Sequence, residues 1–260
     1  MATSNAGAVL YDRAFMLSEA QRNRLLELWE IEKYGADSFA DPDYVSIYGM
    51  LPADWYGRGI RLLARTTLEA VRDRLGDRIG ADVAKLAGAI AERGRVAVVD
   101  PFAGSCNALY WLLRHLPDAD GLAFESDRVI CELTRRNLVH LDRTITLVAG
   151  DYRARLVEHA FPSDLFLIVF VAPPWGDALD PRAGLDLRLT QPPVADIVAR
   201  FEELYPSNPL LYVIQTHQHL VADSLTDLER SLAWSQLRVY DINEEGMKHG
   251  VILGANRWSP

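Results

Sequence analysis

From residue 96 onward, the apolar positions form short β-rich runs separated by stretches in which apolar residues recur at helical spacing. This alternation is typical of successive βα units around a mostly parallel sheet. The last two runs are joined by residues 243–246 alone, too few for a crossover helix, so we expect an antiparallel hairpin at one edge. Residues 96–260 therefore predict an α/β domain with a seven-stranded, mostly parallel sheet. The predicted strands cover residues 96–100, 121–125, 144–149, 165–171, 210–216, 237–242 and 251–255.

Residues 1–95 follow a helical pattern and predict a separate N-terminal helical cap. A capping-box pattern at Ser18 and Gln21 predicts the start of a first helix. Apolar positions at helical spacing predict a second helix over 60–75 and a third over 83–90.

An irregular segment within this cap, residues 34–56, is dense in aromatic and acidic residues. It is interpreted either as the wall of a substrate pocket, with Tyr48 and Trp55 as candidate contacts, or as loops that pack helices together. The aromatic residues are Tyr34, Phe39, Tyr44, Tyr48, Trp55 and Tyr56, and the acids are Asp37, Asp41, Asp43 and Asp54.

The net charge of the chain affects which binding partners are favoured. The 27 basic and 36 acidic residues give a net charge of −9, which disfavours long-range attraction to nucleic acid without excluding it. Cys106 and Cys131 are the two cysteines, which fits a reducing cytosol and predicts neither a disulfide framework nor a metal site. No leader pattern and no apolar run near 20 residues is present, so we expect a cytoplasmic protein without membrane segments.

The first predicted strand ends at Asp100, a glycine-containing turn follows, and a helix opens near Asn107. In such sheets ligands bind beside the carboxyl ends of strands, and a turn of small residues lets backbone N–H groups approach the ligand. The turn lacks the glycine patterns of dinucleotide-binding and phosphate-binding loops, so neither class is supported.

Acidic residues also end the next two strands. Glu125 follows Asp100 by 25 positions and could accept hydrogen bonds from both hydroxyls of a ribose. Asp151 could accept from an adenine amino group, with Tyr152 lying on the ring, and Asp100 could hold an ammonium group. The three acids therefore suit a ligand with an amine, a ribose and an adenine, and no triphosphate.

The fourth strand ends in the sequence FVAPPWG. Pro173 and Pro174 can neither continue a strand nor donate backbone hydrogen bonds. We therefore expect a rigid ledge that presents carbonyl groups and the ring of Trp175.

In order and spacing, the segments DPFAGSCN, FESD, GDY and APPWG resemble a class I S-adenosylmethionine-dependent methyltransferase of the amino-group (N-methylating) type. DPFAGSCN is similar to the cofactor loop of DNA amino-methyltransferases. APPWG is similar to their proline-proline-aromatic motif and to the serine-proline-proline-tryptophan-glycine form of RNA-cap trimethylguanosine synthases. Trp55 and Tyr56 also resemble these synthases weakly. The resemblance spans roughly residues 96 to 255 and implies a Rossmann-like fold.

The resemblance also implies S-adenosylmethionine as the cofactor and assigns roles by position. Ala172, Pro173, Pro174 and Trp175 would face the nucleophilic nitrogen. Two departures matter: Ala172 stands where nucleobase enzymes usually have Asp, Asn or Ser, and Cys106 stands where glycine is usual. The implied cofactor-binding residues are Asp100, Pro101, Phe102, Ala103, Gly104, Asn107, Glu125, Asp151, Tyr152 and Ala172.

Methyl transfer to nitrogen is an in-line displacement, so alignment of the two reactants is the main requirement. An aliphatic amine has a pKa of about 10 and must lose its proton before it attacks. The candidate proton acceptors are His217, His219, Asp177 and Asp180, of which we favour His217. Asp177 and Asp180, together with Trp175, are also candidate substrate contacts.

Three functions remain open at this point. The first is N-methylation of a small, cationic amine, such as an amino sugar of antibiotic or other specialised metabolism. The second is RNA or DNA amino-methylation, and the third is a cofactor-binding module without turnover. A cluster of arginines could attract nucleic acid locally: Arg58, Arg61, Arg65, Arg72 and Arg74.

Overall fold

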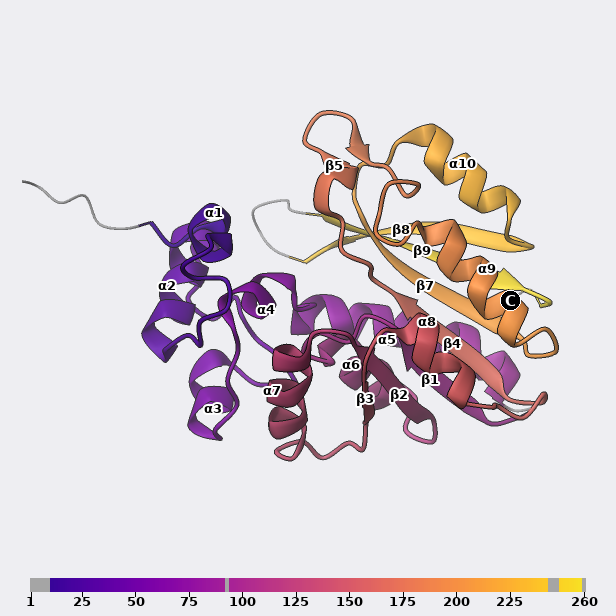
Figure 1. The fold of residues 1–260 in the computed structure, drawn as a ribbon, viewed down its shortest axis with the longest axis horizontal. Coiled ribbons are helices and arrows are strands. Elements are labelled where there is room, and N and C mark those ends of the chain that lie inside the picture. The colour runs from indigo at the N-terminus through magenta and orange to yellow at the C-terminus, as the bar shows by residue number, and fades with distance from the viewer. Residues whose placement is uncertain (1–9, 92–93, 243–247, 259–260) are drawn as a thin grey trace, which may run out of the picture.

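A computed structural model describes residues 10–91, 94–242 and 248–258. Its centre is a seven-stranded sheet in the order β3-β2-β1-β4-β7-β9-β8, in which β9 alone runs antiparallel to the other strands (Figure 1). The predicted α/β fold class is therefore confirmed. The strands are β1 Val96–Asp100, β2 Asp120–Glu125, β3 Thr146–Ala149, β4 Phe166–Val171, β7 Leu210–His217, β8 Trp234–Asp241 and β9 Lys248–Asn256.

The C-terminal hairpin has the predicted antiparallel pairing. Leu237 of β8 lies opposite Ile252 of β9, and β9 also pairs with β7, where Val213 lies opposite Leu253. The predicted link at 243–246 lies outside the described residues. A small two-stranded sheet, β5 Leu179–Asp180 and β6 Gly184–Leu185, lies in the long connection after β4.

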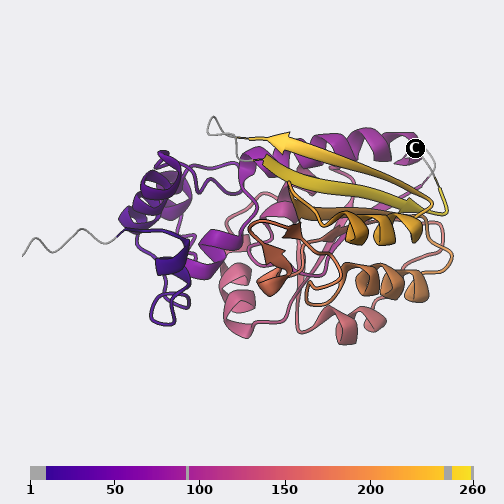
Figure 2. The same ribbon diagram turned by 90° about the horizontal axis from the view of Figure 1, so that it is seen from above.

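Helices cover both faces of the sheet, as the view from above shows (Figure 2). One apolar core forms beneath α5 and α6, and the end of α7 packs against it. The other lies beneath α8, α9 and α10. These helices are α5 Asp73–Ala91, α6 Asn107–His115, α7 Arg128–Leu138, α8 Tyr152–Arg155, α9 Val194–Leu204 and α10 Ala222–Arg230, and the 3₁₀ helices are η1 Leu156–Glu158 and η2 Gly176–Ala178. Among the described residues, no helix is both long and apolar enough to cross a membrane.

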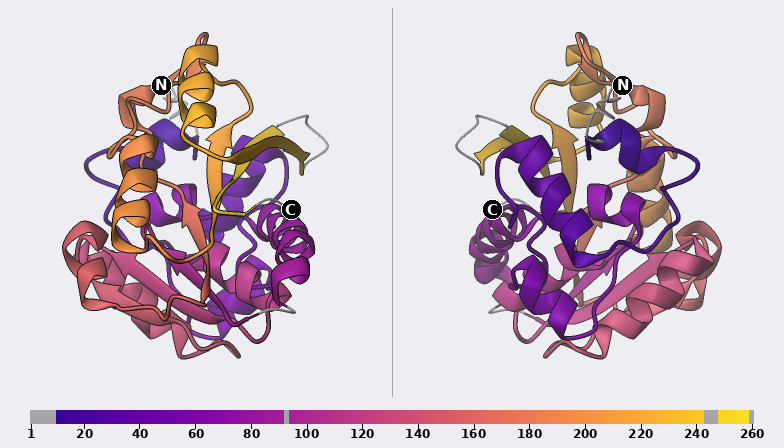
Figure 3. Two further views of the ribbon diagram at one scale, coloured as in Figure 1. Left: turned by 90° about the vertical axis from the view of Figure 1, so that its right-hand side faces the viewer. Right: turned by 90° about the vertical axis from the view of Figure 1, so that its left-hand side faces the viewer.

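Four short helices form a cap at the end of the sheet where the parallel strands finish (Figures 1 and 3). The cap has its own core, in which Met16, Ile31 and Trp55 are fully buried, and Tyr110 of α6 also belongs to this core. The cap therefore covers the end of the sheet at which the sequence predicts the functional residues. Its helices are α1 Arg13–Leu17, α2 Leu28–Phe39, α3 Pro52–Gly57 and α4 Ala64–Glu69.

The predicted helix starts in the cap are wrong in position. Ser18 follows α1, whose N-cap is Asp12, and the capping box belongs to α2, where Glu27 and Glu30 form it. The Ser18 pattern fails because a turn intervenes before the chain becomes helical again.

The predicted helix over 60–75 is also wrong. The chain is extended at Leu63 and again at Ala70, so only the middle of the predicted segment lies in α4 and only its end in α5. Its last member, Leu75, belongs to the same helix as the predicted 83–90 segment. This helix packs against the sheet core, although its residues lie within the predicted cap segment.

Candidate functional site

The turn after β1 is built around a buried carboxyl group. Asp100 is 1% exposed, and its Oδ1 accepts a hydrogen bond from the backbone N–H of Phe102 at 3.0 Å. Burial, with a smaller contribution from the charge of Glu125, raises the pKa of Asp100 to about 7. Gly104 has a φ of +49°, and a Cβ at this position would meet no atom within 4 Å. The turn therefore presents open space beside a desolvated acid.

Glu125 at the end of β2 holds this turn in place. Its Oε2 accepts from the backbone N–H of Gly104 at 2.9 Å, and its Oε1 accepts from that of Asp127 at 2.7 Å. The side chain is nearly buried, and this burial raises its pKa. A carboxylate offers about four acceptor positions, so about two remain after the backbone contacts. Glu125 can therefore accept from two further hydroxyl groups.

Asp151 and Tyr152 follow β3. Asp151 caps α8 by accepting from the backbone N–H of Arg153 at 2.9 Å, and the ion pair with the Arg153 guanidinium lowers the pKa of Asp151. Tyr152 is 4% exposed, with ring centroids 5.3 Å from Phe102 and 6.4 Å from Phe201. The carboxylate of Asp151 thus lies at the predicted strand end, whereas the Tyr152 ring is part of the core and presents little free surface for stacking.

The predicted ledge follows β4. Pro173 is buried, Pro174 is exposed, and Ala172 and Trp175 are half-buried. The indole of Trp175 meets the imidazole of His217 edge-on, with ring centroids 6.2 Å apart. The fold therefore brings together two residues that are 42 positions apart in the sequence and that the sequence analysis assigned to catalysis.

His217 has a close backbone neighbour. Its Nδ1 lies 3.2 Å from the backbone N–H nitrogen of His219 and 3.3 Å from the His219 carbonyl oxygen. Nδ1 can accept from that N–H, which leaves the ring proton on Nε2, or it can carry the proton and donate to the carbonyl, which leaves Nε2 free to accept a proton.

The acids beyond the ledge are partly engaged within their own loop. Asp180 Oδ1 accepts from the backbone N–H groups of Arg182 and Ala183, each at 2.7 Å. Asp186 pairs with Arg188 at 2.7 Å. Asp177 is exposed.

The candidate substrate contacts in the cap are core residues in this structure. Trp55 is fully buried, and its Nε1–H donates to the Val45 carbonyl at 3.0 Å. Tyr48 is 2% exposed, and its hydroxyl donates to the carbonyl of Ser105 in the turn after β1. The structure thus shows the helix-packing alternative for these two rings, because neither faces an open recess.

Asn107, assigned by resemblance to the cofactor, instead joins the cap to the first turn of α6. Its Oδ1 accepts from the backbone N–H of Tyr48 at 2.7 Å. Its Nδ2 donates to the carbonyl of Val71 at 2.6 Å and to Asp73 Oδ1 at 3.1 Å. All of these atoms come from the cap or its junction with α5, so Asn107 positions the cap over the turn after β1.

The cap also makes contacts near Glu125 that were not predicted from the sequence. Arg65 of α4 pairs with Asp127, just beyond β2, at 2.6 Å. One helical turn later, Glu69 is exposed, yet desolvation by surrounding protein raises its pKa and the charge of Glu125 adds to this effect. Only the (i, i+4) spacing of Arg65 and Glu69 on α4 could have indicated that these two residues lie on one face of the helix.

The arginine cluster does not form a continuous solvated stripe. Arg61 lies 3.6 Å above the Tyr56 ring centroid and donates to two backbone carbonyls. Arg65 is paired with Asp127, and Arg72 is buried. Arg58 and Arg74 are exposed, so the local attraction for nucleic acid that the sequence left open would rest on these two of the five arginines.

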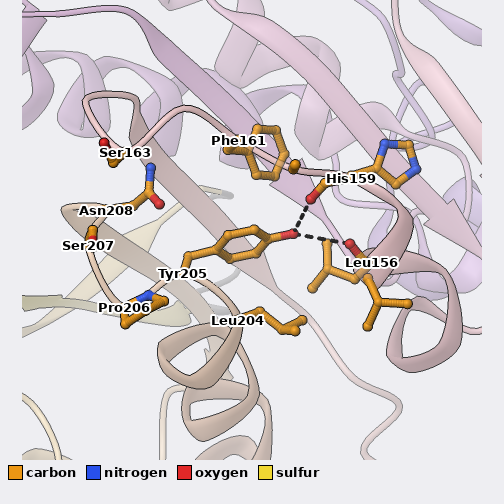
Figure 4. A pocket seen from close by; sticks show the side chains of 11 residues that line it. Leu156, His159, Phe161, Ser163, Leu204, Tyr205, Pro206, Ser207 and Asn208 are labelled. Carbon is orange, nitrogen blue, oxygen red and sulfur yellow. Dashed lines mark hydrogen bonds between the residues drawn. The ribbon is translucent and has the colours of Figure 1, made fainter.

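A cavity of about 330 Å³ lies at the opposite end of the strands, where β4 and β7 begin (Figure 4). The hydroxyl of Tyr205 donates there to the carbonyls of His159 at 2.9 Å and Leu156 at 3.2 Å. Asn208 likewise donates to backbone carbonyls, those of Pro162 and Leu165. These polar groups are satisfied by the chain itself, so the cavity is a junction between loops. It lies far from the strand ends that carry the acids.

The sequence matches no protein-family model and no curated protein. Among solved structures, the METTL16 methyltransferase domain is 16% identical, with 72% of this chain and 70% of that chain aligned and a TM-score of 0.50. The human METTL16 N-terminal domain in complex with SAH is 15% identical over 66% and 68% of the two chains, with a TM-score of 0.46.

A protein of Listeria monocytogenes, described as a candidate class I S-adenosylmethionine-dependent methyltransferase, is 13% identical with a TM-score of 0.49. The alignment covers 71% of this chain and 62% of the Listeria chain, so this chain spans less than two thirds of that protein. Likeness at this level of identity shows the fold alone. Together with the strand order, the METTL16 match identifies the fold as the Rossmann-like fold of methyltransferases, as the sequence predicts.

Proposed function

We propose that the protein is an S-adenosylmethionine-dependent N-methyltransferase that acts on an amino group of a small molecule. The observation that carries the proposal is the set of acids at the ends of three neighbouring strands, Asp100, Glu125 and Asp151, beside the diproline ledge that ends the next strand. In open α/β sheets, ligands bind at this edge.

The residues present fit such a cofactor. The space beside Gly104 admits a ligand that a Cβ would obstruct, and the two remaining acceptor positions of Glu125 match the two hydroxyls of a ribose. Asp100 would hold the ammonium group and Asp151 the adenine amino group. When bound, the cofactor supplies a methyl group on a positively charged sulfur, which a nitrogen lone pair can displace.

The chain's own contribution is to orient the acceptor and remove its proton. The carbonyl of Ala172, the stiff backbone at Pro173 and the ring of Trp175 would hold the amine in line. His217, in contact with Trp175, would accept the amine proton at Nε2 while Nδ1–H donates to the His219 carbonyl.

A small acceptor is favoured over nucleic acid because three of the five clustered arginines, Arg61, Arg65 and Arg72, are stacked, paired or buried. An amino sugar in particular has no specific support. Of the two acids expected to contact a cation, Asp180 already accepts hydrogen bonds within its own loop, and Asp177 is exposed. The proposal is therefore a small-molecule amine without restriction to that class.

Transfer of a labelled methyl group from S-adenosylmethionine tests the proposal, with panels of aliphatic amines, aminoglycosides and short RNA and DNA strands as acceptors. Methylation of amines with none of the nucleic acids supports it. Methylation of RNA or DNA alone overturns the substrate class, and tight cofactor binding without transfer to any acceptor favours a non-catalytic module.

Replacement of Trp175 by alanine should separate the two halves of the site. Because the indole lies at the ledge and contacts His217, we expect kcat/KM for the acceptor to fall about tenfold or more. Affinity for S-adenosylhomocysteine, measured by calorimetry, should change by less than about twofold. Trp175→Phe, which keeps an aromatic ring, should retain most activity. Equal damage to cofactor affinity and turnover would contradict this division of roles.

A further inference from the structure

The sheet ends on one side in a long strand whose outer edge is unpaired. β8 pairs with β9 through all eight of its residues without a bulge, and in the described part of the chain no strand pairs with its other edge. The strand at the opposite side of the sheet, β3, has four residues. A long free edge presents a row of backbone N–H and C=O groups that can pair with a further strand.

The edge lacks features that commonly prevent such pairing. β8 reads WSQLRVYD, which contains no proline and no lysine. Its one basic residue, Arg238, is directed toward α5, where it forms an ion pair with Asp82. The hydroxyl of Tyr240, on the same face of the strand, also donates to Asp82, at 2.9 Å. The edges of monomeric sheets are usually protected by such residues, by bulges or by short strands. β8 is therefore open to another strand.

The other face of β8 is apolar and exposed. Side chains alternate across a strand, so Leu237 and Val239 lie on the face away from α5, where they are 39% and 48% exposed. Ser235, at the start of this face, donates to Glu229 of α10 at 3.5 Å. The two apolar residues beyond it stay uncovered beside the free edge, so a partner strand would find both backbone groups and apolar side chains there.

A second copy of β8 fits this edge. Two β8 strands related by a two-fold axis perpendicular to the sheet pair antiparallel and keep matching faces on the same side. With Leu237 on the axis, residues 234–240 of each copy are paired, and the apolar and aromatic side chains meet one another. The facing pairs are then Leu237 with Leu237, Ser235 with Val239, Gln236 with Arg238, and Trp234 with Tyr240.

Charge selects this register. β8 carries one positive and one negative residue, Arg238 and Asp241, and neither faces a like charge when Leu237 lies on the axis. An axis through Arg238 would give a similar overlap but would place two guanidinium groups directly opposite each other, which is unfavourable. The Leu237 register instead places the uncharged amide of Gln236 opposite Arg238.

We propose that β8 is the interface of a symmetric homodimer, in which the two seven-stranded sheets join into one and Leu237 lies on the two-fold axis. The pairing uses the long edge of each copy and leaves the short β3 strands outermost, so the assembly closes at two chains. Because the paired strands run in opposite directions, the two candidate sites lie at opposite ends of the dimer and neither copy completes the site of the other. The inference is therefore independent of the proposed function.

The mass of the full chain in solution is the first test. Analytical ultracentrifugation over about a hundredfold range of concentration should show a species of twice the 29.1 kDa chain mass that dissociates on dilution. A single chain at every concentration would overturn the proposal, and β8 would then be an edge that some other partner or none occupies.

Charge substitutions at position 237 test the axis. Leu237→Glu and Leu237→Lys each place two like charges opposite each other, so the dissociation constant of each variant alone should rise at least about tenfold. Mixed in equal amounts, the two variants should form a heterodimer, because opposite charges then meet. Val139→Glu, which adds the same charge at an exposed apolar position after α7, should leave the dimer unchanged. Each variant is first shown to be folded by circular dichroism. A dimer that Leu237→Glu does not weaken, or a mixture that does not recover, would contradict this interface.

Cysteine cross-linking tests the register. The native Cys106 and Cys131 are buried, so a cysteine introduced on the exposed face of β8 supplies the accessible thiol. Directly opposite Cα atoms lie about 4.5–5.5 Å apart, within the roughly 4.4–6.8 Å that a disulfide spans. Leu237→Cys should therefore form a covalent dimer on mild oxidation. Ser235→Cys and Val239→Cys should each stay uncross-linked alone, because like positions are four residues apart along the strand, and should cross-link when mixed. Cross-linking of Val239→Cys alone, or of no variant, would overturn the proposed pairing.

Discussion

Replacement of Glu125 by glutamine should weaken the binding of S-adenosylhomocysteine by about a hundredfold, because two charge-assisted hydrogen bonds to the ribose are weakened or lost. Glutamine keeps the shape of the side chain but replaces one acceptor oxygen with a donor. One backbone N–H, that of Gly104 or of Asp127, would then face an NH₂ group. Calorimetric titration of the wild type and the variant measures the loss.

A comparison of two nucleosides with and without ribose hydroxyls distinguishes loss of the ribose contact from disruption of the turn after β1. For wild-type protein, adenosine should bind more tightly than 2′,3′-dideoxyadenosine, because the latter lacks both hydroxyls. In Glu125→Gln this difference should nearly vanish, so the variant and the ligand change should be strongly non-additive. Glu132→Gln, which removes an exposed acid from α7, is the matched control. A Glu125 variant that still discriminates between the two nucleosides would show that the ribose lies elsewhere.

The sheet and its acids could be predicted from the sequence because they depend on local pattern. The predicted 96–100 strand agrees with β1 at both ends, and Glu125 ends β2 as expected. A buried strand is a short continuous apolar run, and the first polar residue after it marks the end of the strand. That rule alone places Asp100, Glu125 and Asp151 at one edge of the sheet.

The cap could not be predicted in the same way because its structure depends on distant partners. Asn107 is bonded to Tyr48, Val71 and Asp73, which lie 34 to 59 positions earlier in the chain. No local pattern distinguishes such an asparagine from one that contacts a ligand. Likewise, the break between α4 and α5 leaves the apolar periodicity nearly intact, although α4 packs into the cap core and α5 into the sheet core.

Replacement of Asp100 by asparagine should stabilise the protein at neutral and alkaline pH. The folded-state pKa is about 7, whereas an aspartate in an unfolded chain titrates near 3.8. Between these values the folded protein holds a proton that the unfolded chain has released, so the wild type loses stability as the pH rises through this window. Above about pH 7 the whole penalty applies, up to about 4 kcal/mol for a shift of roughly three units.

Asparagine keeps Oδ1 as an acceptor for the Phe102 N–H and carries no charge at any pH. The gain in unfolding free energy should therefore be near zero at about pH 4, rise between about pH 4 and 7, and stay constant above. Urea unfolding across this range measures it, and Asp118→Asn, which removes an exposed acid, controls for net charge. The same variant should bind S-adenosylhomocysteine more weakly, because the ammonium group would lose its counter-ion. A difference in stability that does not vary with pH would mean that Asp100 is not desolvated, and an unchanged affinity would mean that its burial serves no ligand.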